Sequence, residues 1–193
     1  MRRAIIAGVR LAIASVLVLV GCSGPSSEGT GKIPPCDQKC QDESASRALR
    51  ETMKLAFNLT LQGKPVGAQD VSTPCPQGGS GRIEGTATSN AQQGSTEVDL
   101  VYTFDKCSYL LKDDNPASNY RMTISGKITQ KGIIAVQPSS TTGLVIGSDN
   151  LTFDGTVYEP PIPFKVESCV IAFGQNGNRL SGTLCGREVA ISL

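Results

Sequence analysis

Apolar and polar residues alternate with a period of two along residues 96–105, TEVDLVYTFD. The apolar positions are Val98, Leu100, Tyr102 and Phe104. The polar positions between them are Glu97, Asp99, Thr103 and Asp105, with Val101 as the exception. Because successive side chains of a strand point to opposite faces, this pattern predicts a strand with one buried and one solvated face, as in antiparallel sheets.

A short motif recurs four times after Cys75 and consists of an apolar residue, any residue and a glycine. Its copies are residues 83–88, 124–129, 153–158 and 180–185. A second β-like segment follows each copy, at residues 98–104, 132–137, 163–173 and 187–193. The repeat predicts a mainly β fold of four hairpins, a curved antiparallel meander of about eight strands. Both a sandwich and a half-barrel fit this pattern.

The curvature is inferred from glycines at matching places in the four copies. These glycines are Gly85, Gly126, Gly155 and Gly182. Glycine inside a strand marks a bend, a bulge or a close backbone approach. The alternative is that the glycines leave room for a ligand.

One N-terminal helix is predicted over residues 41–62, with Asp42 or Ser44 as the N-cap. Its apolar stripe is Ala45, Leu49, Met53 and Ala56, and we expect it to pack on the sheet. Residues 54–62 also alternate with a period of two, so a strand is the alternative for this tail.

Residues 1–23 resemble the signal sequence of bacterial lipoproteins. A basic N-terminus at residues 1–3 precedes an apolar segment at residues 4–20. This segment is shorter than the roughly 20 residues that a membrane-spanning helix needs. Residues 19–22, LVGC, resemble the lipobox, with Leu at −3, a small residue at −1 and Cys at +1.

This resemblance implies that a signal peptidase removes residues 1–21 and that Cys22 carries a diacylglyceryl group and an N-acyl chain. No other cofactor is expected. Ser23 at +2 implies an outer-membrane location if the host is Gram-negative. The expected organisation is a signal peptide, a lipidated cysteine with a flexible Pro- and Gly-rich tether at residues 22–35, and one helix-plus-β domain at residues 36–193.

Six of the seven cysteines remain after Cys22, and an even number in an exported chain indicates disulfides. A metal site is not expected, because the chain has no histidine and no second short cysteine pair. Counting outward from a three-residue turn at residues 176–178 places Cys169 opposite Cys185.

The other four cysteines form two further pairs. Cys75 with Cys107 would tie a Gly-rich loop to the end of the first hairpin. Cys36 with Cys40 follows by elimination.

Catalytic signatures are absent from the sequence. Without histidine, no Ser-His or Cys-His nucleophile pair exists. A hydrolase that uses two carboxylates is the remaining enzymatic alternative. Removal of the signal peptide takes three basic residues away, so the mature chain has fewer basic residues than its 17 acidic ones. The sequence therefore gives no indication of a basic surface that would bind nucleic acid.

These features predict a non-catalytic envelope lipoprotein that is anchored to the membrane by lipid. We expect an interaction module that contacts protein or glycan. The alternative is a carrier of lipid or another hydrophobic ligand, held between the helix and the curved sheet. A helix followed by a curved antiparallel sheet resembles the lid-and-half-barrel plan of lipoprotein carrier proteins, although no sequence motif of that family is present.

Overall fold

The computed structural model describes residues 35–61, 66–90, 94–135 and 142–193. The predicted signal peptide, the lipidation site Cys22 and nearly all of the tether lie outside these residues. Among the described residues, no helix has both the length and the apolar character that crossing a membrane requires. The lipid anchor therefore stays a prediction from the sequence.

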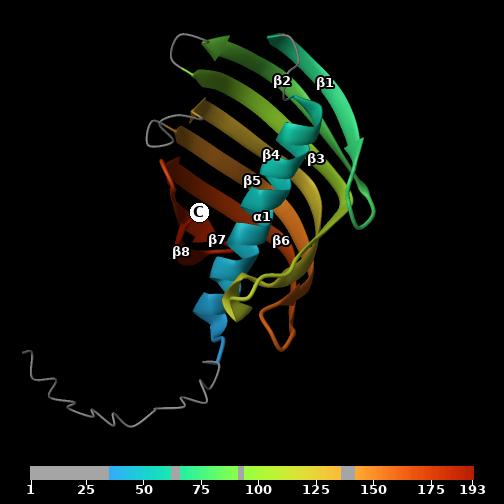
Figure 1. Cartoon of the computed structure of the whole chain (residues 1–193), viewed down its shortest axis with the longest axis vertical. Coiled ribbons are helices and arrows are strands. Elements are labelled where there is room, and N and C mark those ends of the chain that lie inside the picture. The colour runs from blue at the N-terminus through green and yellow to red at the C-terminus, as the bar shows by residue number, and fades with distance from the viewer. Residues whose placement is uncertain (1–34, 62–65, 91–93, 136–141) are drawn as a thin grey trace, which may run out of the picture. The chain divides into compact units, whose positions relative to one another are not determined.

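Eight antiparallel strands form one sheet in chain order, in which each strand pairs with the next. The strands are β1 (Gly67–Pro74), β2 (Ser80–Asn90), β3 (Ser95–Leu111), β4 (Tyr120–Ala135), β5 (Gly143–Val157), β6 (Ile162–Asn176), β7 (Arg179–Leu184) and β8 (Arg187–Ser192). The sheet curves strongly and stays open, with β1 and β8 as its edges (Figure 1). The structure confirms the curved meander and is a half-barrel, since a sandwich needs two sheets packed face to face.

One of the four predicted hairpins, at residues 124–137, does not form. The sequence predicts a separate strand at residues 132–137, but residues 132–135 continue β4 without a turn. Gly132 adopts a φ of 126° there, and pairing with β3 and β5 continues across it. β1, which the repeat does not predict, completes the eight strands instead, and β5 is longer than predicted because it begins at Gly143. Pairing with a strand on each side thus carries β4 through Gly132.

The motif glycines let neighbouring strands approach closely. Gly182 has a φ of 146° and Gly85 has a φ of 129°. A methyl group at Gly182 would collide with the carbonyl oxygen of Ala172 on β6, and one at Gly85 would collide with that of Asp99 on β3. The backbone of the sheet fills the space beside these glycines, which supports curvature over room for a ligand.

The helix α1 (Gln38–Thr60) begins earlier than predicted. Its N-cap is Asp37, whose side chain accepts a hydrogen bond from the backbone N–H of Cys40 at 2.9 Å. The predicted caps, Asp42 and Ser44, are instead buried side chains inside the helix. Ser44 donates a hydrogen bond to the carbonyl of Ala117 at 3.0 Å, so its hydroxyl serves tertiary packing.

The tail of the helix is helical and does not form a strand. Met53 and Ala56 are fully buried, whereas Leu59 is 58% exposed. This spacing follows the helical period, and it is set by the sheet beneath α1. The alternation along residues 54–62 therefore carries no structural information here.

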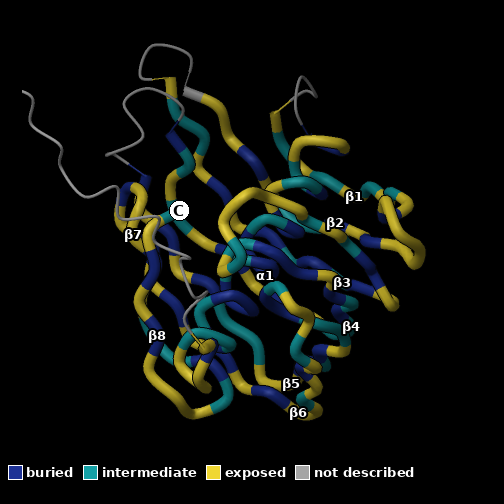
Figure 2. Tube along the Cα trace, turned by 60° about the horizontal axis from the view of Figure 1, so that its bottom comes forward, coloured by how far each residue is buried: buried dark blue, intermediate teal, exposed yellow. Residues whose placement is uncertain are grey.

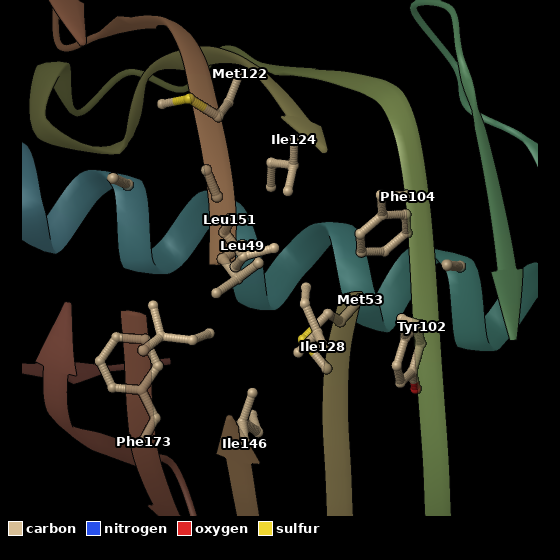
Figure 3. Close-up of a cluster of buried hydrophobic side chains, with 14 of the residues drawn as sticks. Leu49, Met53, Tyr102, Phe104, Met122, Ile124, Ile128, Ile146, Leu151 and Phe173 are labelled. Atoms are coloured by element: carbon tan, nitrogen blue, oxygen red, sulfur yellow. The ribbon is translucent and has the colours of Figure 1, made fainter. Parts of the chain in front are cut away.

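The core lies between α1 and the concave face of the sheet. α1 crosses the strands and packs against β1 to β5 and β8 (Figure 1). Buried and exposed positions alternate along the strands (Figure 2). The predicted stripe of Ala45, Leu49, Met53 and Ala56 is buried in full. Figure 3 shows Leu49 and Met53 among strand side chains such as Phe104, Ile124 and Ile128.

Candidate ligand-binding cavity

A cavity of about 700 Å³ lies between the second half of α1 and one end of the concave face. Its helical wall runs from Arg50 to Leu61. The opposite wall comes from β2, β3 and β4, and the hairpin between β6 and β7 lies at its side. This volume falls within the roughly 300–1,000 Å³ that small-molecule sites occupy. The helix thus covers a filled core with its first half and a cavity with its second half.

Arg50 is the buried charge of this cavity. The residue is 9% exposed, and its Nε donates a hydrogen bond to Oε1 of Gln175 on β6 at 2.7 Å. The amide of Gln175 in turn donates to the carbonyl of Gly177 at 2.9 Å. Desolvation by burial lowers the pKa of Arg50 from its ordinary value. The guanidinium is therefore held in place by a neutral amide.

No carboxylate of the described residues pairs with Arg50 within 4.0 Å. Glu51, the next residue of α1, pairs with Lys54 at 3.5 Å instead. The two terminal amino groups of Arg50 make no hydrogen bond to a described residue. A charge removed from water with most of its donors unused favours a negatively charged ligand.

A second polar pair lies deep in the cavity on the sheet side. The hydroxyl of Tyr102 on β3 donates a hydrogen bond to Oε1 of Gln130 on β4 at 2.6 Å. Burial raises the pKa of Tyr102, so the phenol stays neutral. Figure 3 shows the hydroxyl of Tyr102 on the side of its ring away from Phe104.

The helical wall also carries an apolar row, beside the polar residues Glu51, Lys54 and Asn58. Met53, Phe57 and Leu61 recur every fourth residue and so lie in one row along α1. Ile134 on β4 and Ala87 on β2 face this row from the sheet. The cavity therefore combines a buried charge at Arg50 with an apolar row, an arrangement suited to an amphiphilic ligand.

Sequence reasoning did not find Arg50, Gln130 or Gln175. A signal for the two glutamines was present, because each occupies an inward position of a strand whose other inward residues are apolar. In β6 the inward row is Cys169, Ile171, Phe173 and Gln175. A polar residue in such a row is buried against a partner, which indicates a site. Arg50 carried no comparable signal, since Arg47 and Lys54 stand at similar helical spacing.

A shallower depression of about 410 Å³ lies on the outer face of the sheet. Its lining is polar and includes Lys106, Arg121 and Asp154. Thr123 contributes a hydroxyl, which donates to Oγ of Ser108 at 3.2 Å. No buried charge and no apolar wall accompany this depression among the described residues, so it is the weaker candidate.

The three predicted disulfides form as paired in the sequence. Cys36 bonds to Cys40, Cys75 to Cys107 and Cys169 to Cys185. None of these cysteines lines the cavity described above. Their role is to tie together segments of the fold, and Cys22 lies outside the described residues.

The register used to pair Cys169 with Cys185 is wrong by one residue. The turn holds two residues, and Asn176 pairs with Arg179. The disulfide still forms because Cys185 follows the end of β7 in a left-handed conformation, with a φ of 51°. Its backbone N–H donates to the carbonyl of Val170 at 2.8 Å, which brings the two sulfur atoms together.

Acidic side chains do not converge in the cavity. Glu51 is the carboxylate-bearing side chain among its described lining residues. Within the part of the chain that the structure describes, no group of three or more His, Cys, Asp or Glu residues is placed to hold a metal ion.

Comparison with known proteins gives no relative for this chain. No family model matches it, and neither a curated protein nor a solved structure matches it.

Proposed function

We propose that this protein binds or carries a hydrophobic ligand in the cavity between α1 and the concave face of the sheet. The observation that carries this proposal is the cavity of about 700 Å³ with the apolar row of Met53, Phe57 and Leu61 along its helical wall. A fold that needed the helix only for its core would fill this space with side chains, because protein interiors pack at crystal-like density.

Envelope anchoring through a lipid at Cys22 belongs to the same proposal. It is supported by the resemblance of residues 19–22 to the lipobox. Incorporation of labelled palmitate into the wild-type chain but not into the Cys22→Ser chain would test it. Labelling of both chains, or of neither, would contradict it.

The interaction module predicted from the sequence has less support. It would need a contiguous apolar patch on the surface. Ile133 on β4 and Val145 on β5 are exposed and lie diagonally across one strand pair. Val170 on β6 is four residues from Gly174, the partner of Val145. The exposed apolar residues on these three strands are therefore spread out.

Native mass spectrometry tests the carrier proposal directly. The protein is exported to the periplasm as the Cys22→Ser form and purified without detergent. We expect an additional hydrophobic mass that survives gentle desolvation and is lost after extraction with organic solvent. A protein without bound mass, which also fails to take up a neutral fluorescent probe, would contradict the proposal.

A pair of matched variants assigns any bound mass to the cavity. Ala87→Phe places a ring in the cavity, whereas Ala172→Phe places the same ring on the exposed outer face of β6. We expect Ala87→Phe to lose the bound mass and Ala172→Phe to keep it. Equal retention by both variants would place the ligand elsewhere.

A further inference from the structure

The environment of Arg50 distinguishes this cavity from a purely apolar one. A guanidinium carries five N–H donors, and the structure uses one of them, the Nε donor to Gln175 at 2.7 Å. The residue is 9% exposed. Burying a cation without an anionic partner is unfavourable, so such a group is normally paired. A ligand with a negative charge would supply the missing partner.

No neighbouring charged residue among the described ones forms an ion pair with Arg50. Glu51 pairs with Lys54 at 3.5 Å and lies beyond ion-pair distance of Arg50. Gln175 and the Tyr102–Gln130 pair are neutral. Among the described lining residues, the Arg50 end of the cavity therefore attracts an anion.

The apolar row beyond Arg50 sets the shape of the rest of the ligand. Met53, Phe57 and Leu61 follow Arg50 along one side of α1. Leu61 lies eleven positions after Arg50, which corresponds to a rise of about 16 Å along a helix. A chain of methylene groups that starts at Arg50 would stay in contact with this row over that length.

The volume of the cavity matches a ligand of about one chain. A methylene group needs nearly as much room as a water molecule, roughly 30 Å³. A cavity of about 700 Å³ therefore holds on the order of 20 non-hydrogen atoms. One long acyl chain with a small head group has this size, and a lipid with two long chains does not.

We propose that the cavity binds a single-chain anionic amphiphile. Its carboxylate or phosphate head accepts hydrogen bonds from the terminal N–H groups of Arg50, and its chain lies along Met53, Phe57 and Leu61. This inference rests on the proposed function, since it names the ligand class of the same cavity.

Displacement of a fluorescent fatty acid from the Cys22→Ser protein tests the inference. Palmitate and hexadecanol have the same chain length and differ in the charge of the head group. We expect palmitate to bind wild-type protein roughly ten- to a hundredfold more tightly than hexadecanol, which corresponds to charge-assisted hydrogen bonds. Arg50→Gln should remove this difference by weakening the binding of palmitate. Arg121→Gln, a matched change on the outer face of β4, should retain the difference.

The outcomes separate this inference from the proposed function. Equal binding of palmitate and hexadecanol by wild-type protein would overturn the anionic head group and leave the carrier proposal standing. Binding of neither would contradict the carrier proposal itself. If inorganic phosphate or butyrate displaced the fluorescent fatty acid at the same concentration as palmitate, the site would bind an anion but would not bind an acyl chain. If Arg50→Gln does not fold, the comparison of ligands on wild-type protein still decides.

Discussion

The guanidinium of Arg187 donates two hydrogen bonds to the carboxylate of Asp42, from Nε at 2.6 Å and from the second amino group at 2.8 Å. Asp42 lies on α1 and Arg187 begins β8, so the contact joins the start of the helix to the end of the chain. The Asp42 side chain is 3% exposed and that of Arg187 is 42% exposed. This bidentate pair ties the first half of the helix to the sheet, whereas the half beside the cavity is held by packing and by the hydrogen bond from Arg50 to Gln175.

Removal of Arg187 should destabilise the protein. Among the described residues, Arg187→Gln leaves the buried carboxylate of Asp42 with Gln38 as its one remaining side-chain donor, at 3.0 Å. We expect a loss of about 1–3 kcal/mol in the free energy of unfolding, below the value for a fully buried pair because Arg187 is partly exposed. Urea unfolding measures this loss. Arg121→Gln is the control and should stay within about 0.5 kcal/mol of wild type. A similarly small effect of Arg187→Gln would show that the pair does not hold the helix.

Two buried tyrosines should respond in opposite ways to loss of their hydroxyl. Tyr102 donates to Gln130 at 2.6 Å, whereas the buried hydroxyl of Tyr120 has no hydrogen-bond partner among the described residues. Tyr102→Phe should therefore cost about 1 kcal/mol of stability. Tyr120→Phe should be neutral or stabilising, since it removes an unpaired polar atom from the core. Equal losses in the two variants, compared by urea unfolding, would contradict this difference.

The free energy of unfolding should fall at alkaline pH. Burial raises the pKa of both Tyr102 and Tyr120 above the ordinary value of 10.0. The unfolded chain releases these phenolic protons near pH 10, while the folded chain retains them. Their contribution is therefore complete below pH 10 and is lost as the pH rises above it, by up to about 1.4 kcal/mol per pH unit for each group.

Tyrosinate absorbance and urea unfolding measure this dependence together. We expect ionisation of Tyr102 and Tyr120 to coincide with unfolding. The Tyr102→Phe, Tyr120→Phe double variant should show a smaller loss of stability above pH 10. If the double variant loses stability as steeply as wild type, other groups cause the alkaline effect.

Two glycines with different surroundings test the account of sheet curvature. Gly182 has a positive φ and lies against the carbonyl of Ala172, whereas nothing lies within 4 Å of a methyl group at Gly174. Gly182→Ala should cost about 2–4 kcal/mol through strain and backbone displacement. Gly174→Ala should be neutral or stabilising by about 0.5 kcal/mol. Thermal melting of both variants decides, and a tolerated Gly182→Ala would refute the close approach of β6 and β7.

Much of the architecture follows from the sequence because it depends on local periodicity. The alternation of Val98, Leu100, Tyr102 and Phe104 sets the buried face of β3 directly. Pairing of Cys169 with Cys185 also followed, although the register was wrong by one residue. Predictions of this kind tolerate a small error in register. A period of two sets which face of a strand is buried, and a short separation between two cysteines places both in one hairpin.

The cavity was decided by tertiary structure alone. Arg47, Arg50 and Lys54 are three basic residues on one helix, and nothing in their local sequence distinguishes them. The angle at which α1 crosses the sheet buries Arg50 against Gln175 and leaves Lys54 exposed. The sequence by itself determined a stapled, curved meander with a covering helix. Only packing between elements distant in the chain determined where that helix leaves a space and which charge lies in it, because burial depends on the facing surface.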